Sequence, residues 1–191
     1  MYRRVMVPSI AALVLALALP VAAQQSVASP PSSLAPYVPT PQDVVDRMLS
    51  LAGVSSGDVV YDLGCGDGRI VITAAKKFGA RGVGVDIDPE RIKESQANAK
   101  TAGVEHLVSF KLQDALTVDV SPASVVTLYL LSSSNAKLRP ILTRQLKPGA
   151  RIVSHAFGMA DWTPEKTDIF TDSGGTQRTL YRWTVDGQVR D

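Results

Sequence analysis

A glycine-rich turn between a predicted strand and a predicted helix is the feature that most constrains the fold. Residues 62–69 read DLGCGDGR, after the β-branched run of residues 58–63 and before the helical pattern of residues 69–78. Glycines in such a turn adopt dihedrals closed to other residues and let a ligand approach the main chain. The amides at the start of the next helix point toward that ligand. The unit therefore predicts an open α/β sheet with a ligand at the carboxyl ends of its strands.

Strands and helices alternate along the rest of the chain. A first helix is expected from Thr40, as the N-cap, to Gly53, and further helices at residues 89–102 and 135–146. Further strands are expected at residues 81–86, 107–112, 124–130 and 150–155, followed by a closing hairpin near residues 167–170 and 178–185. This order predicts an α/β fold of the Rossmann-like, doubly wound type, with a mostly parallel seven-stranded sheet and an antiparallel edge strand.

The N-terminal segment has the three-part pattern of a secretory signal. Arg3 and Arg4 precede an apolar run at residues 10–19, and small residues follow up to Ala23. We expect a signal peptide at residues 1–23, a flexible linker at 24–39 and the folded domain at 40–191. The protein would then be exported, to the periplasm or outside the cell, with no stable membrane span after cleavage. An uncleaved N-terminal anchor is the alternative, although the run is shorter than the roughly 20 residues that span a bilayer.

Charge and cysteine content exclude several classes of function. The chain has 20 Lys and Arg residues, of which two belong to the expected signal, which leaves 18 against 18 Asp and Glu. A near-neutral domain gives no reason to expect a nucleic acid partner. One cysteine and two distant histidines form neither an internal disulfide nor a metal site.

The spacing of the glycines distinguishes between nucleotide ligands. A dinucleotide-binding turn needs G-x-G-x-x-G, but here Arg69 stands at the position of the third glycine. An acidic residue, Asp62, also ends the strand. An acid beside backbone amides suits the ammonium and carboxylate of S-adenosylmethionine, so Asp62, Gly64, Cys65 and Gly66 are predicted to bind that cofactor. Cys65 is interpreted as a small packing residue and not as a nucleophile.

Two further acidic positions follow the next strands. Asp86 lies 20 residues after Gly66 at the end of the second strand, where a carboxylate accepts hydrogen bonds from ribose hydroxyls. Ile87 is predicted to lie against the adenine ring, and Asp88 to cap the helix that begins at Pro89. After the third strand, Asp114 and Ala115 are predicted to contact the adenine, with Asp114 accepting from its amino group. A capping role for Asp114 is the alternative.

These two segments together resemble motif I and its partner strand in the seven-stranded, class I S-adenosylmethionine-dependent methyltransferases. A narrower resemblance extends from Tyr37 to Pro164. It includes Tyr37-Val38-Pro39-Thr40, the apolar strand and turn at residues 125–134, residues 148–154, and Phe157 with Asp161-Trp162-Thr163-Pro164. This pattern is similar to the lysine N-methyltransferases of the ATP synthase c-subunit and the adenine nucleotide translocase, and to their bacterial relatives. The resemblance implies methyl transfer to a lysine amine of a protein.

The candidate catalytic residues are predicted from their positions near the strand ends: Tyr37, Thr40, Tyr129 and Asp161. His155, at the end of the fifth strand, is a weaker candidate for substrate contact. The place of the Asn/Asp-Pro-Pro-Tyr/Phe motif of amide methyltransferases is taken by Tyr129-Leu130-Leu131-Ser132, which disfavours a planar amide acceptor. A lysine acceptor must lose its proton, against a free pKa of about 10.4, so its pocket must desolvate it.

Two other functions remain open from the sequence. The domain could be a non-catalytic S-adenosylmethionine-binding module, or a methyltransferase of small molecules. Retention of Asp62, Asp86 and Asp114 argues against a decayed site. Export is harder to reconcile with this cofactor, because the cofactor is made in the cytosol.

Overall fold

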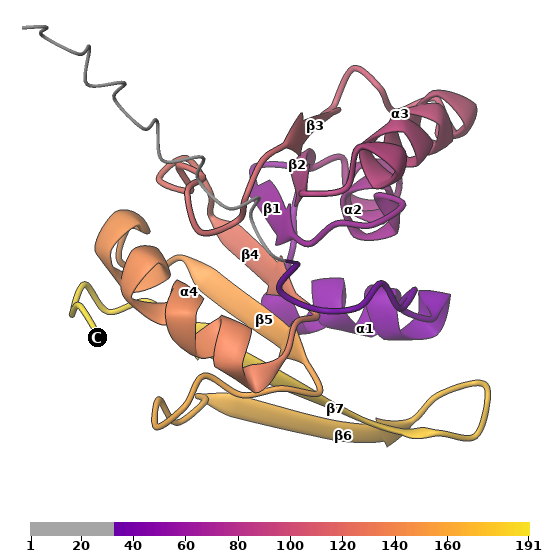
Figure 1. Ribbon diagram of the computed structural model, residues 1–191. Coiled ribbons are helices and arrows are strands. Elements are labelled where there is room, and N and C mark those ends of the chain that lie inside the picture. Colours follow the sequence, from indigo (N-terminus) through magenta and orange to yellow (C-terminus); the bar gives the residue numbers. More distant parts are fainter. Residues whose placement is uncertain (1–32) are drawn as a thin grey trace, which may run out of the picture. The chain divides into compact units, whose positions relative to one another are not determined.

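The computed structural model describes residues 33–191, so the expected signal at residues 1–23 and the first part of the expected linker lie outside the described residues. Four helices and seven strands follow in the order α1 (Gln42–Ala52), β1 (Val59–Leu63), α2 (Arg69–Phe78), β2 (Arg81–Asp86), α3 (Pro89–Ala102), β3 (Val108–Leu112), β4 (Val125–Leu128), α4 (Ser132–Gln145), β5 (Arg151–His155), β6 (Lys166–Thr171) and β7 (Gln177–Thr184). Figure 1 shows these elements with their labels.

The strands form one sheet in the order β3-β2-β1-β4-β5-β7-β6. The first five strands in this order are parallel, whereas β7 is antiparallel to both β5 and β6. The doubly wound, mostly parallel sheet and its closing hairpin are therefore confirmed. The antiparallel strand is β7, which pairs between β5 and the edge strand β6. Because β1 and β4 are neighbours, the chain reverses its direction of winding at this point, where ligands bind in such sheets.

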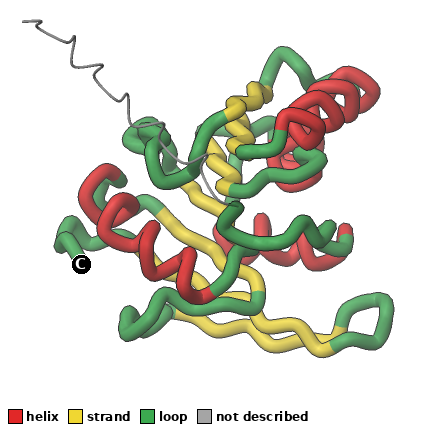
Figure 2. The backbone as a smooth tube through the Cα atoms, viewed as in Figure 1, coloured by secondary structure: helices red, strands yellow, loops and turns green. Residues whose placement is uncertain are grey.

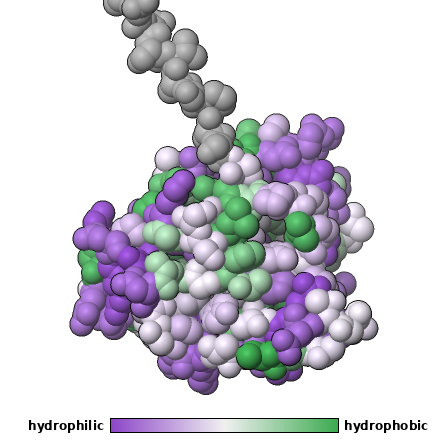
Figure 3. Space-filling model, turned by 60° about the horizontal axis from the view of Figure 1, so that its bottom comes forward, coloured by the Kyte–Doolittle hydropathy of each residue, from purple (hydrophilic) through white to green (hydrophobic). Residues whose placement is uncertain are grey.

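Helices cover both faces of the sheet, as Figures 1 and 2 show. On one face, α1 and α2 pack through Val44, Met48 and Val71 against strand residues that include Val60 and Val153. On the opposite face, Leu138 and Leu142 of α4 pack with Val126, Leu128 and Ile152. Burial on both faces explains why β4 is apolar throughout. Figure 3 shows that strongly hydrophilic side chains gather toward the sides of one face, with apolar and weakly polar ones across its centre.

Two local expectations need correction. The N-cap of α1 is Pro41, and Thr40 is a buried residue before it whose carbonyl accepts from the Arg69 side chain. Helix α4 begins three residues earlier than expected, at Ser132, because the serine-rich turn after β4 is already helical. Helix α1 ends at Gly53 as expected, and Gly53 adopts the left-handed conformation.

The described end of the expected linker, residues 33–39, contains no helix or strand. Leu34 and Ala35 pack against the core cluster on the α4 face, and the Leu34 carbonyl accepts a 2.5 Å hydrogen bond from Ser134. Within residues 33–191, no helix combines the length and apolarity needed to cross a membrane.

Candidate functional site

A cavity of about 240 Å³ opens at the carboxyl ends of β1 and β2. Its walls come from the glycine turn and from the segments after β2, β3 and β4, together with residues 33–40. Eleven of the predicted site residues line it: Tyr37, Thr40, Asp62, Gly64, Cys65, Gly66, Asp86, Ile87, Asp114, Ala115 and Tyr129. The tertiary structure therefore brings together residues that are separated by more than 90 positions in the sequence.

Gly64 and Gly66 of the turn contribute main chain alone to the cavity, and the side chains of Leu130 and Tyr37 pack closely against them. Gly64 and Gly66 have φ values of 83° and 52°, and the amides of Gly64 and Cys65 both donate to the Val85 carbonyl of β2. A Cβ on Gly64 would lie 2.9 Å from Leu130 Cδ2, and a Cβ on Gly66 would collide with the Tyr37 ring. The turn is thus held against β2 in a shape that only glycine permits at these positions.

Asp62 is the buried acid of the site. Its side chain is 3% exposed, and Thr127 of β4 donates a 2.7 Å hydrogen bond to Oδ1. Burial, with smaller contributions from the negative charges of Asp86 and Asp67, raises the pKa of Asp62 to about 7. The hydrogen bond from Thr127 opposes this rise. A cationic ammonium placed in the cavity would favour the carboxylate, so the residue suits the amino end of an amino acid ligand.

This raised pKa predicts that S-adenosylmethionine binding weakens as the pH falls from 7.5 to 5.5. Below the pKa of Asp62 an increasing fraction of the protein carries a neutral acid that cannot pair with the ammonium. The dissociation constant should rise by about twentyfold across this range, approaching tenfold per pH unit. Calorimetric titrations at four pH values measure the dissociation constant. The Asp62→Asn variant should bind weakly with a flat profile, and parallel profiles for both proteins would contradict the assignment.

Asp86, at the end of β2, already holds two backbone amides. Its Oδ2 accepts from Gly66 N at 2.8 Å and its Oδ1 from Asp88 N at 3.0 Å. The carboxylate therefore fixes the glycine turn relative to β2 and keeps lone pairs for ribose hydroxyls. The predicted cap is confirmed, because Asp88 accepts from Glu90 N at the start of α3.

Asp114 and Ala115 lie at the wall that follows β3. Asp114 Oδ1 accepts a 2.9 Å hydrogen bond from Leu116 N, which is the turn role left open from the sequence. The residue also lines the cavity, so the two roles are compatible. Ile87 adds apolar surface next to Asp86.

Tyr37 and two arginines form a cover over the glycine turn. The Arg91 guanidinium lies 4.6 Å from the centre of the Tyr37 ring, and Arg69 donates to the Thr40 carbonyl at 2.7 Å. Arg69 also pairs with Asp67 at 2.5 Å, and Arg91 pairs with Glu94. Sequence reasoning did not identify Arg91 as a site residue. Its position on a solvent-facing part of α3 gave no signal, because only the fold brings α3 beside residues 33–40.

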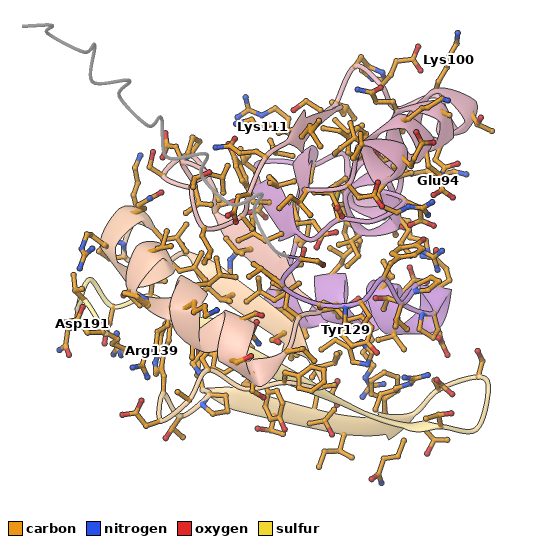
Figure 4. The ribbon with its side chains drawn as sticks, in the orientation of Figure 1. Glu94, Lys100, Lys111, Tyr129, Arg139 and Asp191 are labelled. Carbon is orange, nitrogen blue, oxygen red and sulfur yellow. The ribbon has the colours of Figure 1, made fainter. Side chains whose placement is uncertain are left out.

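Tyr129 and Asp161 are placed differently. Tyr129 lines the cavity directly after β4, and Figure 4 shows it toward the interior, while Lys100 and Lys111 project from the periphery. Asp161 is not among the cavity-lining residues: its side chain is 89% exposed and pairs with Arg139 of α4. Hydrogen bonding and charge attraction from Arg139 lower the pKa of Asp161. Asp161 therefore holds the loop after β5 against α4 and does not face the cavity.

Cys65 is 5% exposed, and burial raises the pKa of its thiol, so the side chain is a neutral packing group. Within residues 33–191, no group of three or more His, Cys, Asp and Glu side chains is arranged to hold a metal ion. The acids, the bare glycine turn and the apolar walls together fit a cationic amino acid nucleoside such as S-adenosylmethionine.

Comparisons with known proteins agree with this fit. Residues 62–166 match the family model of the ANTKMT methyltransferase domain. A protein-lysine N-methyltransferase of Saccharolobus islandicus is 48% identical over 151 residues, which are 78% of this chain and 93% of the relative. The lysine N-methyltransferase of the ATP synthase c-subunit from Xenopus laevis is 32% identical over 79% of this chain, which spans 63% of that relative.

A solved structure is also similar. It is described as an RNA methyltransferase from Salinibacter ruber in complex with S-adenosyl-L-homocysteine. It is 55% identical, with a TM-score of 0.75, and the match covers 81% of this chain and 97% of the other. The presence of the demethylated cofactor in that protein agrees with the ligand that the cavity here fits.

Proposed function

Because this chain belongs to the family of the ANTKMT methyltransferase domain, we propose that it methylates a lysine side chain of a protein, with S-adenosylmethionine as the methyl donor. When bound, the donor supplies a methyl group activated by a cationic sulfur. The observation that carries the proposal is the convergence of Asp62, Asp86 and Asp114 with the glycine turn on one cavity.

Each of the three acids of the cavity would hold one part of the donor. Asp62 pairs with the ammonium, Asp86 accepts from the ribose hydroxyls, and Asp114 accepts from the adenine amino group. The strand order leaves the ends of β4 and β5 beside this arrangement for the acceptor. The protein then contributes mainly by positioning, which supplies up to about 7–11 kcal/mol of a barrier when two reactants are held in line.

An RNA acceptor is the second candidate, because the similar Salinibacter ruber structure is described as an RNA methyltransferase. RNA binding needs basic side chains that are free to meet phosphates. At this cavity Arg69 and Arg91 are paired with Asp67 and Glu94, and acidic and basic residues balance once the expected signal is removed. These charges support the protein acceptor.

In the test, the chain from Gln24 onward is incubated with radiolabelled S-adenosylmethionine in three separate reactions. These reactions contain envelope protein, cytosolic protein and total RNA, respectively. We expect label in protein, released as methyl-lysine on acid hydrolysis. The Asp86→Ala variant serves as the inactive control. Label confined to RNA would replace the lysine proposal by the second candidate, and label in neither would refute both.

We also propose that residues 1–23 direct export. The proposal predicts that the chain recovered from cell-envelope fractions begins at Gln24, which intact-mass measurement determines. A full-length mass in the cytosolic fraction alone would contradict it.

A further inference from the structure

The cavity accounts for the donor but leaves the acceptor side undescribed. Tyr129 follows β4, and β5 pairs with β4 on the side away from β1. The segment that follows β5 therefore lies beside Tyr129, and an acceptor reaching the donor from this side meets both segments.

Three rings gather at this point. The centroid of the Tyr129 ring lies 4.0 Å from that of His155 at an interplanar angle of 35°, and 6.5 Å from that of Phe157 at 27°. Tyr129 and Phe157 are half-buried, whereas His155 is 1% exposed. Tyr129 lines the cavity, whereas His155 and Phe157 lie outside its lining. The aromatic group therefore extends away from the cavity wall through Tyr129.

His155 adds a ring without adding a charge. Its Nδ1 is buried and has no hydrogen-bond partner among the described residues. Burial, assisted by the positive charge of Arg178 and opposed by Asp172, lowers the pKa of His155 to about 4. The imidazole behind Tyr129 is therefore neutral near pH 7 and does not repel a cation.

The main chain that carries Phe157 is held firmly from α4. Asn135, fully buried in the first turn of α4, donates to the carbonyls of Phe157 and Gly158 at 3.1 and 3.3 Å. Ser154 Oγ donates to the Phe157 carbonyl at 2.6 Å. Ala156 has a φ of 65°, a conformation that costs a non-glycine residue about 1–2 kcal/mol. Such strain is maintained where the surroundings fix the backbone, often at ligand sites.

We propose that Tyr129 and Phe157 form an aromatic wall that receives the aliphatic stem and the nitrogen of the acceptor lysine, with Phe157 as a specificity-determining residue. The proposal rests on the proposed function. During transfer the lone pair of the neutral amine forms the N–C bond while the S–C bond breaks and leaves its electrons on sulfur. Positive charge thereby moves to nitrogen, and one N–H proton then passes to water. An aromatic face beside that nitrogen stabilises the charge as it appears.

The first experiment compares Phe157→Leu, Phe157→Tyr and Phe170→Leu with the wild type. Phe170, on β6, is a half-buried phenylalanine like Phe157, but it packs on the α1 side and not beside Tyr129, so it is the matched control. With poly-lysine as the acceptor, Phe157→Leu should raise KM about tenfold, whereas the donor dissociation constant stays within twofold. Phe157→Tyr and Phe170→Leu should retain wild-type KM. An unchanged KM for Phe157→Leu would overturn the proposal.

The second experiment does not depend on catalysis. Two tripeptides are titrated, with NMR detection, into the complex of the protein with S-adenosylhomocysteine. One contains trimethyl-lysine, and the other contains the uncharged tert-butyl isostere of that residue. The wild type should bind the cation at least about fivefold more tightly, and Phe157→Leu should lose this preference. A wild type that methylates no lysine yet shows the preference would refute the proposed function and support the wall. Equal binding of both peptides by the wild type would refute the wall.

Discussion

Replacing Asp86 by alanine is expected to weaken S-adenosylmethionine binding by about a hundredfold or more. Asp86 would accept from the ribose hydroxyls, and it already accepts from the amides of Gly66 and Asp88. Hydrogen bonds to a charged acceptor contribute about 1.5–3 kcal/mol each, and each 1.4 kcal/mol corresponds to tenfold in affinity. The alanine variant also releases the glycine turn, which adds to the loss. Calorimetry with the wild type and the variant measures the ratio.

The matched control is Asp119→Ala. Asp119 is exposed, lies outside the cavity lining and accepts from the amide two residues ahead, as Asp86 does with Asp88. Its loss should leave donor affinity within twofold of the wild type. If Asp86→Ala also binds the donor with wild-type affinity, the ribose contact assigned to Asp86 is wrong.

Replacing Gly68 by alanine should give the largest loss of stability among the single changes considered. Gly68 has a φ of 80°, and a Cβ there would lie 2.7 Å from Phe110 Cε1 and 2.8 Å from Ser95 Cβ. Backbone strain of about 1–2 kcal/mol and overpacking of about 1–3 kcal/mol add at this position. The expected decrease in the free energy of unfolding is therefore about 2–5 kcal/mol, or a Tm lower by about 5–15 °C.

Gly103→Ala separates the two contributions. Gly103 ends α3 with a φ of 70°, and nothing lies within 4 Å of the Cβ position. This variant carries the backbone cost alone, so its loss should be about 1–2 kcal/mol. Urea unfolding of both variants gives the difference. Equal losses would show that α3 and β3 yield to the new methyl group and that the close packing around Gly68 is not required.

That the predicted donor-binding residues gather at one cavity could be predicted, because their signals are local. Asp62 lies near the end of β1 just before the glycine turn, Asp86 ends β2, and Asp114 follows β3. The sequence makes each of these strands recognisable. In a parallel sheet such positions meet at one edge whatever the details of packing. Most of the strand and helix bounds followed from the same local patterns, with the start of α4 shifted by three residues because serine is ambiguous between a turn and a helix start.

The acceptor side could not be predicted in this way. Asp161 was selected by its position near the strand ends, yet its side chain pairs with Arg139 of α4 and lies outside the cavity lining. Asn135 carried no local signal of function, and Phe157 was noted only as part of the family resemblance. The placement of Phe157 depends on a contact with Asn135 across 22 residues, between a helix and a loop. Arg91 was missed for the same reason.

The amino-acid sequence by itself determined the alternation of strands and helices, the glycine turn and the acids at or just after the ends of the first three strands. These follow from backbone sterics and periodicity, which act over a few residues. Only the tertiary structure decided the order β3-β2-β1-β4-β5-β7-β6, the packing of Tyr37 over Gly66 and the grouping of Tyr129 with His155 and Phe157. Those features depend on which side chains meet across the folded sheet, and burial and packing select such pairs only when the whole core forms.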